Sequence, residues 1–239
     1  MIKKLKKNEE VVALVLLVVF LIAAIALSLM LGSVFIAPDK LLQSEIFWQI
    51  RLPRVILAGI IGLMLSVAGV ILQGMLRNPL ADPYILGVSA GGGVGAAIAI
   101  ALGLQFVFLG MSPVPLFAFV FSLLAVFVVY KLSEIGGETA PETLILAGVA
   151  LSAFCSAILS LIIIISGNLQ SIYFWLLGSL SSASWVNVYT VLPYAVLGVG
   201  AAYFYSKELN ALLLGEELAK TLGVEVEKVR MVLICATSL

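Results

Sequence analysis

Charged residues are spaced so unevenly along this chain that long stretches carry none, and this spacing most constrains the fold. No Asp, Glu, Lys or Arg occurs from 11 to 38 or from 83 to 130. Crossing the hydrocarbon core of a bilayer takes about 20 apolar residues as a helix. Over the whole chain 63% of the residues are hydrophobic and 11% are charged, whereas a soluble domain usually carries about 25% charged residues. We therefore predict an all-α, polytopic transmembrane protein.

The charged residues and prolines divide the chain into six complete spans and the start of a seventh. The predicted spans cover residues 11–36, 55–76, 85–109, 116–130, 144–165 and 186–205, and the seventh begins near 229. The first run is about twice as long as the apolar part of a signal peptide, which favours an uncleaved span over a cleaved signal. A short helix over 171–185 is expected to lie at the outer surface or to dip partly into the membrane.

A helix that begins at Val229 covers only about 16 Å by the last residue, which is half of a bilayer. We therefore expect residues 1–239 to be a single transmembrane domain that is truncated at its C-terminus. The segment 206–228 is rich in charge and is predicted to be a cytosolic loop within that domain.

The positive residues predict the orientation. With the N-terminus in the cytoplasm, Lys40, Arg51 and Arg54 are the outer ones among the 13 Lys and Arg residues. Cytoplasmic loops normally carry the excess of positive charge. We predict a multi-pass protein of the cell (inner or plasma) membrane with a cytoplasmic N-terminus.

Several residue types that carry chemistry are missing from the sequence. There is no histidine, which removes the commonest general base and the commonest metal ligand. No Gly-Lys pair is present, so a P-loop is excluded and any ATP must be bound by another chain. The formal net charge is zero, which offers no basic surface to nucleic acid. We expect no catalytic residue, no metal site, no cofactor and no nucleic-acid partner.

Small residues recur at helical spacing inside two predicted spans. Residues 91–96 also match the dinucleotide-binding fingerprint by letters, but that fingerprint needs a preceding strand and a helix at the water boundary. We interpret the small residues as faces on which a neighbouring helix approaches closely. They are Gly91 and Gly95 in one span and Ala58, Gly62 and Ser66 in the other.

Two prolines follow the second span, four residues apart. A proline disfavours the helical region for the residue before it, so Asn78 before Pro79 and Asp82 before Pro83 are expected to be extended or turned. Either this is a plain cytosolic turn, or it is a rigid, shaped loop that takes part in gating.

The segment from Leu209 to Val224 is predicted to form two short helices. Asn210 can cap the first, and Gly215 suits a left-handed stop. Glu216 and Glu217 open the second helix at the positive end of its dipole, and Gly223 ends it.

An apolar face on these two helices lies outside the predicted spans. Leu212, Leu213, Leu218 and Leu222 form it. Exposed apolar surface of this kind indicates a protein partner, and packing against the inner surface of the chain itself is the alternative.

Further motifs follow one another in order along the chain. They are Arg51-Leu52-Pro53-Arg54, Leu72-Gln73-Gly74, the Arg77–Pro83 run, Leu86-Gly87-Val88-Ser89 and the Trp175–Leu180 run. With the Leu209–Val224 segment, they make the chain from about Arg51 onward resemble the permease subunits of iron-siderophore, haem and vitamin B12 ABC importers.

The resemblance implies an assembly and a fold. It implies ten helices per subunit, so the family continues through spans that this chain lacks. A second permease copy, as a homodimer, would complete a central path through the lipid for a siderophore, haem or cobalamin substrate. Two cytosolic ATPase subunits would lie below it and an extracytoplasmic substrate-binding protein above it.

The resemblance also implies roles for particular residues. For ATPase coupling these are Leu209, Leu212, Leu213, Gly215, Glu216, Glu217, Leu218, Leu222 and Gly223. For gate and path they are Asn78, Pro79, Asp82, Pro83, Leu86, Pro141, Thr143 and Trp175. Arg51 and Arg54 would receive acidic residues of the binding protein, since guanidinium groups take carboxylates bidentately; anchoring to lipid headgroups is the alternative.

Two other classes of function, the secondary transporter and the membrane-embedded enzyme, fit the sequence less well. A secondary, ion-coupled transporter normally buries an acid or base near mid-membrane, and no predicted span carries one. A membrane-embedded enzyme is disfavoured by the missing histidine and by the lack of clustered carboxylates. We expect a permease subunit that is not an enzyme and that converts a partner's motion into gate movement.

Overall fold

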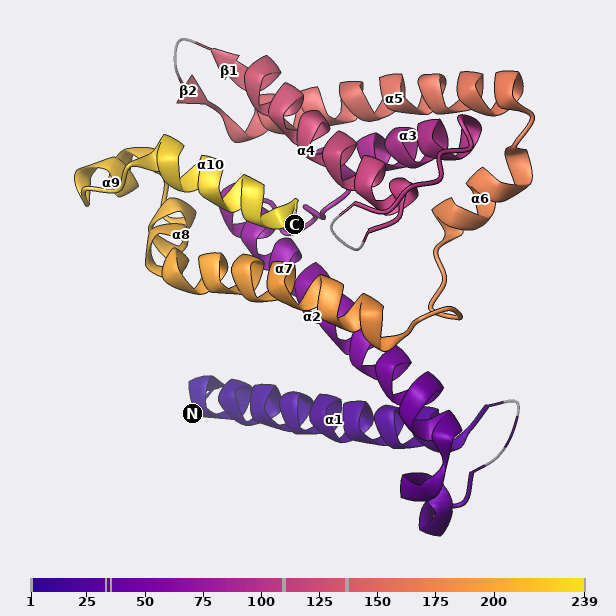
Figure 1. Ribbon diagram of the computed structural model, residues 1–239. Helices are drawn as coiled ribbons and strands as arrows, with labels where there is room; N and C mark the ends of the chain where they lie inside the picture. The colour runs from indigo at the N-terminus through magenta and orange to yellow at the C-terminus, as the bar shows by residue number, and fades with distance from the viewer. Residues whose placement is uncertain (1, 33, 35, 109–110, 136–137, 239) are drawn as a thin grey trace. The chain divides into compact units, whose positions relative to one another are not determined.

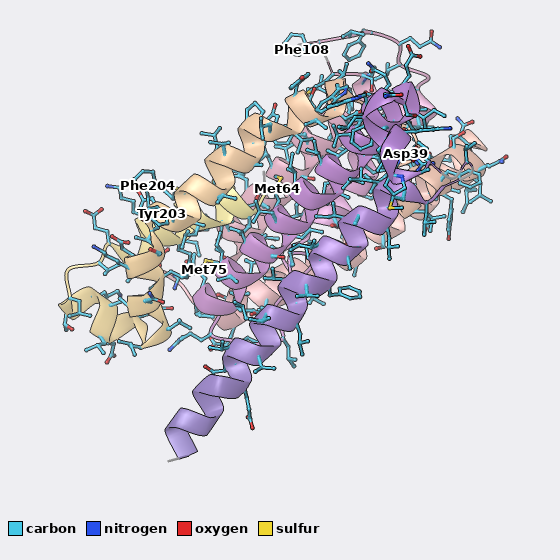
Figure 2. The ribbon with its side chains drawn as sticks, turned by 90° about the horizontal axis from the view of Figure 1, so that it is seen from below. Asp39, Met64, Met75, Phe108, Tyr203 and Phe204 are labelled. Atoms are coloured by element: carbon cyan, nitrogen blue, oxygen red, sulfur yellow. The ribbon has the colours of Figure 1, made fainter. Side chains whose placement is uncertain are left out.

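The computed structural model describes residues 2–32, 34, 36–108, 111–135 and 138–238. Helices make up most of this part of the chain (Figure 1). The strands in it are β1 (Glu134–Ile135) and β2 (Glu138–Thr139), which pair antiparallel with Glu134 opposite Thr139. The fold is therefore all-α and polytopic, as predicted.

The chain divides into two compact units. The first comprises Met1–Gly59 with Leu180–Val188, and the second comprises Ile60–Ser179 with Tyr189–Leu239. Two helices, α2 (Leu52–Met75) and α7 (Trp185–Phe204), contribute residues to both units.

Five helical stretches are long and apolar enough to cross a membrane. They are Glu9–Met30 of α1 (Ile2–Met30), Phe47–Met75, Pro113–Ser133 (α4), Pro141–Ser166 (α5) and Trp185–Phe204. Phe47–Met75 joins a π-helical turn over Phe47–Arg51 to α2. These stretches match five of the predicted spans to within a few residues at most ends, and the first span ends at Met30 rather than at Ile36.

Three predicted helices differ in extent from the structure. The span expected over 85–109 is the 14-residue α3 (Val88–Ala101), about 21 Å long and too short for a full crossing. It is shortened because Gly103, at φ 58°, turns the chain soon after it. The helix expected over 171–185 is α6 (Leu169–Leu177), which ends at Gly178. The last helix, α10, begins at Val226 and runs to Thr237.

Close helix packing confirms one of the two small-residue faces. In the second unit α3 lies against α4 (Figure 1). A side chain at Gly91 would collide with Phe121 and Ala125, and one at Gly95 would collide with the backbone of Phe117. At Gly62, by contrast, no described atom lies within 4 Å of an added Cβ. The expected close approach at this position of α2 is therefore absent from the described structure.

The hydrophobic core of the second unit joins the end of α2 to the helices that follow α7. These are α8 (Ser206–Leu213), α9 (Glu216–Thr221) and α10. The buried core residues are Ile71, Leu72, Met75, Leu76, Ala81, Leu86, Val126, Val129, Leu144, Leu209, Leu212, Ala219, Val226, Val229, Leu233 and Ile234. Segments far apart in the sequence therefore share one packed interior, to which the predicted coupling and gating residues Leu86, Leu209 and Leu212 belong.

Candidate coupling and gating site

Helices α8, α9 and α10 follow one another through two glycine turns. Gly215 has φ 119° and Gly223 has φ 81°, conformations in which a Cβ is disfavoured. These turns confirm the prediction of two short helices that end at glycines. Asn210 does not cap the first helix, because α8 begins four residues earlier, at Ser206.

The leucines of this segment divide into an inner and an outer set. Leu209 and Leu212 belong to the core, with 7% and 2% of their surface exposed. Leu209 packs so closely on Gly74 of α2 that a Cβ at Gly74 would lie 2.9 Å from its Cδ1. The prediction that Leu212 meets a partner protein is therefore wrong, because its position on α8 turns its side chain toward the core.

The outer set is exposed at α8 and α9, where Leu213 and Leu218 lie in the helices and Leu214 and Leu222 directly follow them. We call Leu213, Leu214, Leu218 and Leu222 the leucine edge. Their exposed fractions are 50%, 68%, 47% and 64%. Leu214 was missed by the sequence reasoning, although it extends the run of leucines that starts at Leu212.

Arg230 of α10 lies at the centre of a buried polar cluster that the sequence reasoning also missed. Its side chain is 1% exposed. Nη2 donates to Oε1 of Glu216 at 2.5 Å, and Nη1 donates to Oε1 of Glu227 at 2.6 Å. Nη1 also donates to Oγ1 of Thr139 at 2.6 Å and to the backbone oxygen of Thr139. Glu216, predicted to contact an ATPase, thus points to Arg230.

The second carboxylate of the cluster extends it to α4. Oε2 of Glu227 accepts from the hydroxyl of Thr139 at 2.7 Å and from the hydroxyl of Tyr130 at 3.2 Å. Oε1 of Glu227 accepts from the backbone N–H of Thr139 at 3.2 Å. The first turn of α9, α10, the end of α4 and the residue before the α5 entrance are therefore joined by polar contacts.

A spacing of three residues between Glu227 and Arg230 was the visible signal for this cluster. Residues three apart on a helix share a face, and an ion pair on an otherwise apolar face suggests burial with further partners. The third partner, Thr139, lies 91 residues earlier and carried no signal of its own.

The loop after α2 is built from two similar turns. Oδ1 of Asn78 accepts from the N–H of Leu80 at 2.9 Å, and Oδ1 of Asp82 accepts from the N–H of Tyr84 at 2.8 Å. A side chain that binds the backbone two residues on forms an Asx turn. The prediction that Asn78 and Asp82 are turned before their prolines is confirmed.

This loop packs against α5. Leu86 is 1% exposed and Leu144 of α5 is fully buried in the same core. Gly148 of α5 leaves no room for a Cβ, because the backbone oxygen of Ile85 lies against it. The predicted gate residue Leu86 is therefore held by the first part of α5.

Pro141 and Thr143 form the entrance of α5. Pro141 is its buried first residue, a position where the missing N–H of proline is not needed. Oγ1 of Thr143 donates to the backbone oxygens of Ala140 at 2.8 Å and of Ser133 at 3.1 Å. Trp175, the remaining predicted path residue, lies on α6 beyond the other end of α5 and is 38% exposed.

An open groove borders the site. It has a volume of about 470 Å³ and lies between the end of α2, the loop after it and α8. Arg77, in this loop, has φ 49°, in the left-handed region that is unusual for a residue with a side chain. The lining residues are Val70, Gln73, Gly74, Arg77, Asn78, Pro79, Leu209, Asn210 and Leu213.

In the first unit, the two arginines predicted to dock a binding protein differ from each other. Arg51 is 7% exposed, and its guanidinium donates to the backbone oxygen of Leu29 at 2.8 Å and to that of Val34. As an exposed docking residue Arg51 is therefore a wrong prediction, because its donors serve carbonyls at and beyond the end of α1. Arg54 is half-buried, and its Nη2 donates to the backbone oxygen of Ser181 at 2.5 Å.

Comparison with protein-family models matches residues 17–239 to a family described as the FecCD transport family. Among curated proteins, the chain is 38% identical over 206 residues to the uncharacterized ABC transporter permease protein YvrB of Bacillus subtilis. It is 40% identical over 190 residues to the cobalamin import system permease protein BtuC of Halobacterium salinarum. These alignments cover 85% and 79% of this chain but only 58% and 50% of the relatives.

Among solved structures, the chain is similar to an ABC transporter in an inward-facing conformation, provisionally classed as metal-chelate type. The TM-score is 0.79 at 32% sequence identity, and the match covers 93% of this chain and 70% of the other. The fold on which the leucine edge, the Arg230 cluster and the turns after α2 are arranged is therefore shared with that transporter.

Proposed function

This chain belongs to the FecCD transport family, and on that premise we propose that it acts as the permease subunit of an ABC importer. With a second copy it would form a path for an iron-siderophore, haem or cobalamin substrate. Such polar or bulky substrates do not partition through hydrocarbon, so the subunit must offer a passage that opens to one side at a time. A separate ATPase would supply the energy and a binding protein the substrate.

The leucine edge is the observation that carries this proposal. Four leucines stay exposed in or directly after two short, charged helices, whose inward residues Leu209, Leu212 and Ala219 already lie in the core. An apolar patch rimmed by charged residues is typical of a protein interface. We propose that the ATPase subunit binds this edge. Glu217 and the turns at Gly215 and Gly223 would shape the surface that it binds.

The coupling path is proposed to run through the core of the second unit. Leu212 of α8, Leu86 of the loop after α2 and Leu144 of α5 lie in that core together. A packed interior passes on displacement because it has little free volume. A shift of α8 and α9 would therefore move the loop from Asn78 to Leu86 and the entrance of α5 at Pro141 and Thr143, which we propose as parts of the inner gate. Trp175 on α6 is proposed to line the path.

The orientation is part of the same proposal. The N-terminus and the α8–α9 pair would face the cytoplasm, and Arg54 would lie on the outer side with the binding protein. The distribution of the 13 Lys and Arg residues supports this arrangement.

Reconstituted transport tests the proposal. The chain, co-expressed with candidate ATPase and binding-protein subunits, would be placed in liposomes and offered haem, a ferric siderophore or cobalamin. ATP-dependent accumulation of one of them is the expected result. Accumulation that follows an ion gradient and needs no ATPase would instead favour a secondary transporter and overturn the proposal.

A further inference from the structure

Arg230 is a charged residue in a place that packing alone does not explain. It is 1% exposed, and its Nε is buried with no hydrogen-bond partner among the described residues. Well-packed apolar side chains can replace buried ion pairs with no loss of stability. The contacts of the buried guanidinium therefore indicate a role beyond packing.

The guanidinium joins three separate pieces of the chain. Nη2 binds Glu216, the first residue of α9, at 2.5 Å. Nη1 binds Glu227 on its own helix and Thr139, the last residue of β2, two residues before the entrance of α5. A planar fork of donors fixes the distance and the angle between its acceptors, which a lysine ammonium does not.

α9 depends on such ties for its position. It is six residues long, far below the length at which a helix is stable by itself. Glycine turns at Gly215 and Gly223 flank it and give the backbone freedom on both sides. Ala219, which is fully buried, and the Glu216 carboxylate both hold it to the rest of the unit.

We propose that Arg230 is a positioning residue that holds α9 to the Thr139 segment, so that a displacement of α9 is passed directly to the entrance of α5. Glu227 widens the connection, because it also accepts from Tyr130 at the end of α4. We call the contact that holds α9 to Thr139 the tether, and the transmission of α9 displacement to α5 the relay. The relay rests on the proposed function, because that function is what makes α9 move, whereas the tether does not.

Spin-label distances test the tether without any partner subunit. Labels on Thr221→Cys of α9 and Glu142→Cys of α5, both exposed positions, would be placed in a Cys155→Ala, Cys235→Ala background in lipid nanodiscs. The unaltered cluster should give one narrow distance distribution. Glu216→Ala should widen it about twofold, since α9 then loses its ion pair with Arg230.

Matched variants separate the tether from general loosening. Glu216→Gln should give an intermediate width, because its amide oxygen still accepts from Nη2. Glu225→Gln is the control and should leave the width unchanged, since Glu225 is 75% exposed and pairs with Lys228 at 3.6 Å. Unchanged widths in both Glu216→Ala and Arg230→Met would overturn the tether. If Arg230→Met fails to fold, the Glu216 variants still decide, because Glu216 lies nearer to solvent, with 23% of its side chain exposed.

Transport stoichiometry tests the relay. In liposomes with the ATPase at saturating concentration, Glu216→Ala should raise the number of ATP molecules hydrolysed per substrate molecule about fivefold, because a loss of coupling free energy has an effect of this size. An unchanged ratio would overturn the relay. If even the unaltered chain binds no ATPase while the distance result holds, the tether stands and the proposed function fails.

Discussion

Two segments of this chain were predicted from the sequence to meet a partner protein, and the structure treats them differently. Around α8 and α9 the inner leucines fill the core and a second set of leucines remains exposed. At the start of α2 the arginines already have partners within the chain. Arg51 donates to backbone carbonyls at and beyond the end of α1, and Arg54 donates to the backbone oxygen of Ser181. A docking surface requires side chains that are not already bound within the chain. The α8–α9 segment has more of these than the segment with Arg51 and Arg54.

The charges in the two segments also have different partners. Arg230 binds two carboxylates and a threonine that come from three elements. Arg51 donates to the backbone carbonyl oxygens of Leu29 and Val34. Removing Arg230 leaves negative charge behind in a poorly solvated place, whereas removing Arg51 leaves dipoles. The stability effects should differ accordingly.

The largest effect is expected for Arg230→Met. Breaking a buried pair by removing one partner leaves an uncompensated charge, so the free energy of unfolding should fall by about 3 kcal/mol. Unfolding by denaturant in detergent micelles would measure it. Lys228→Met, on the same helix but with 63% of its side chain exposed, should change stability by at most about 0.5 kcal/mol. Equal effects of the two substitutions would contradict the buried cluster.

The second prediction contrasts an outer with an inner leucine. Leu218→Glu should leave stability within about 0.5 kcal/mol but weaken ATPase binding by about 2 kcal/mol, roughly 30-fold, because interface anchors carry most of the affinity. Leu212→Ala should do the reverse and lower the free energy of unfolding by at least about 2 kcal/mol. Pull-down titration with the purified ATPase and thermal unfolding would separate the two. Normal binding by Leu218→Glu would remove the leucine edge from the interface.

The contrast also shows what the sequence could predict. Turn positions were local enough to predict, because Gly215, Gly223, Asn78 and Asp82 act within a few residues of themselves. Most span positions followed from hydropathy alone. Whether Leu212 or Leu213 points inward could not be predicted, since their helix could have been rotated by one position at no cost visible in the sequence.

The burial of Arg51 and Arg230 was harder to predict from the sequence. The carbonyls that hold Arg51 are 22 and 17 residues upstream, and Thr139 is 91 residues from Arg230. A charged residue is normally read as exposed, and only the three-dimensional arrangement of its partners reverses that expectation. The end of α3 was misplaced because the turn after it, at Gly103, contains no charged residue.

The third prediction concerns Arg51 itself. Arg51→Met should lower the free energy of unfolding by about 2 kcal/mol, since hydrogen bonds from a charged donor are lost and two carbonyls lose their partner. Arg51→Lys should recover part of this, because carbonyl oxygens accept from any positioned donor. Lys40→Met, at an exposed position, is the control in the same detergent unfolding assay. A full loss in Arg51→Lys would mean that the fork geometry, and not donation alone, is needed there.

The smallest effect is expected for Arg54, the arginine left to the docking hypothesis. Its side chain is half-buried, its Nη2 already donates to Ser181 and its Nε is buried, so only part of the guanidinium is open to a partner. Arg54→Glu should therefore weaken binding of the extracytoplasmic binding protein by about 1 kcal/mol, or about fivefold, which is the range of partly exposed ion pairs. The loss should shrink as salt is raised, because the pair is screened, and a Glu→Arg change on the binding protein should restore affinity. Lys40→Glu reverses another positive charge in the same unit and serves as the control. If Arg54→Glu binds with unchanged affinity and unchanged salt dependence, neither predicted arginine docks the partner, and the segment before α2 serves the fold alone.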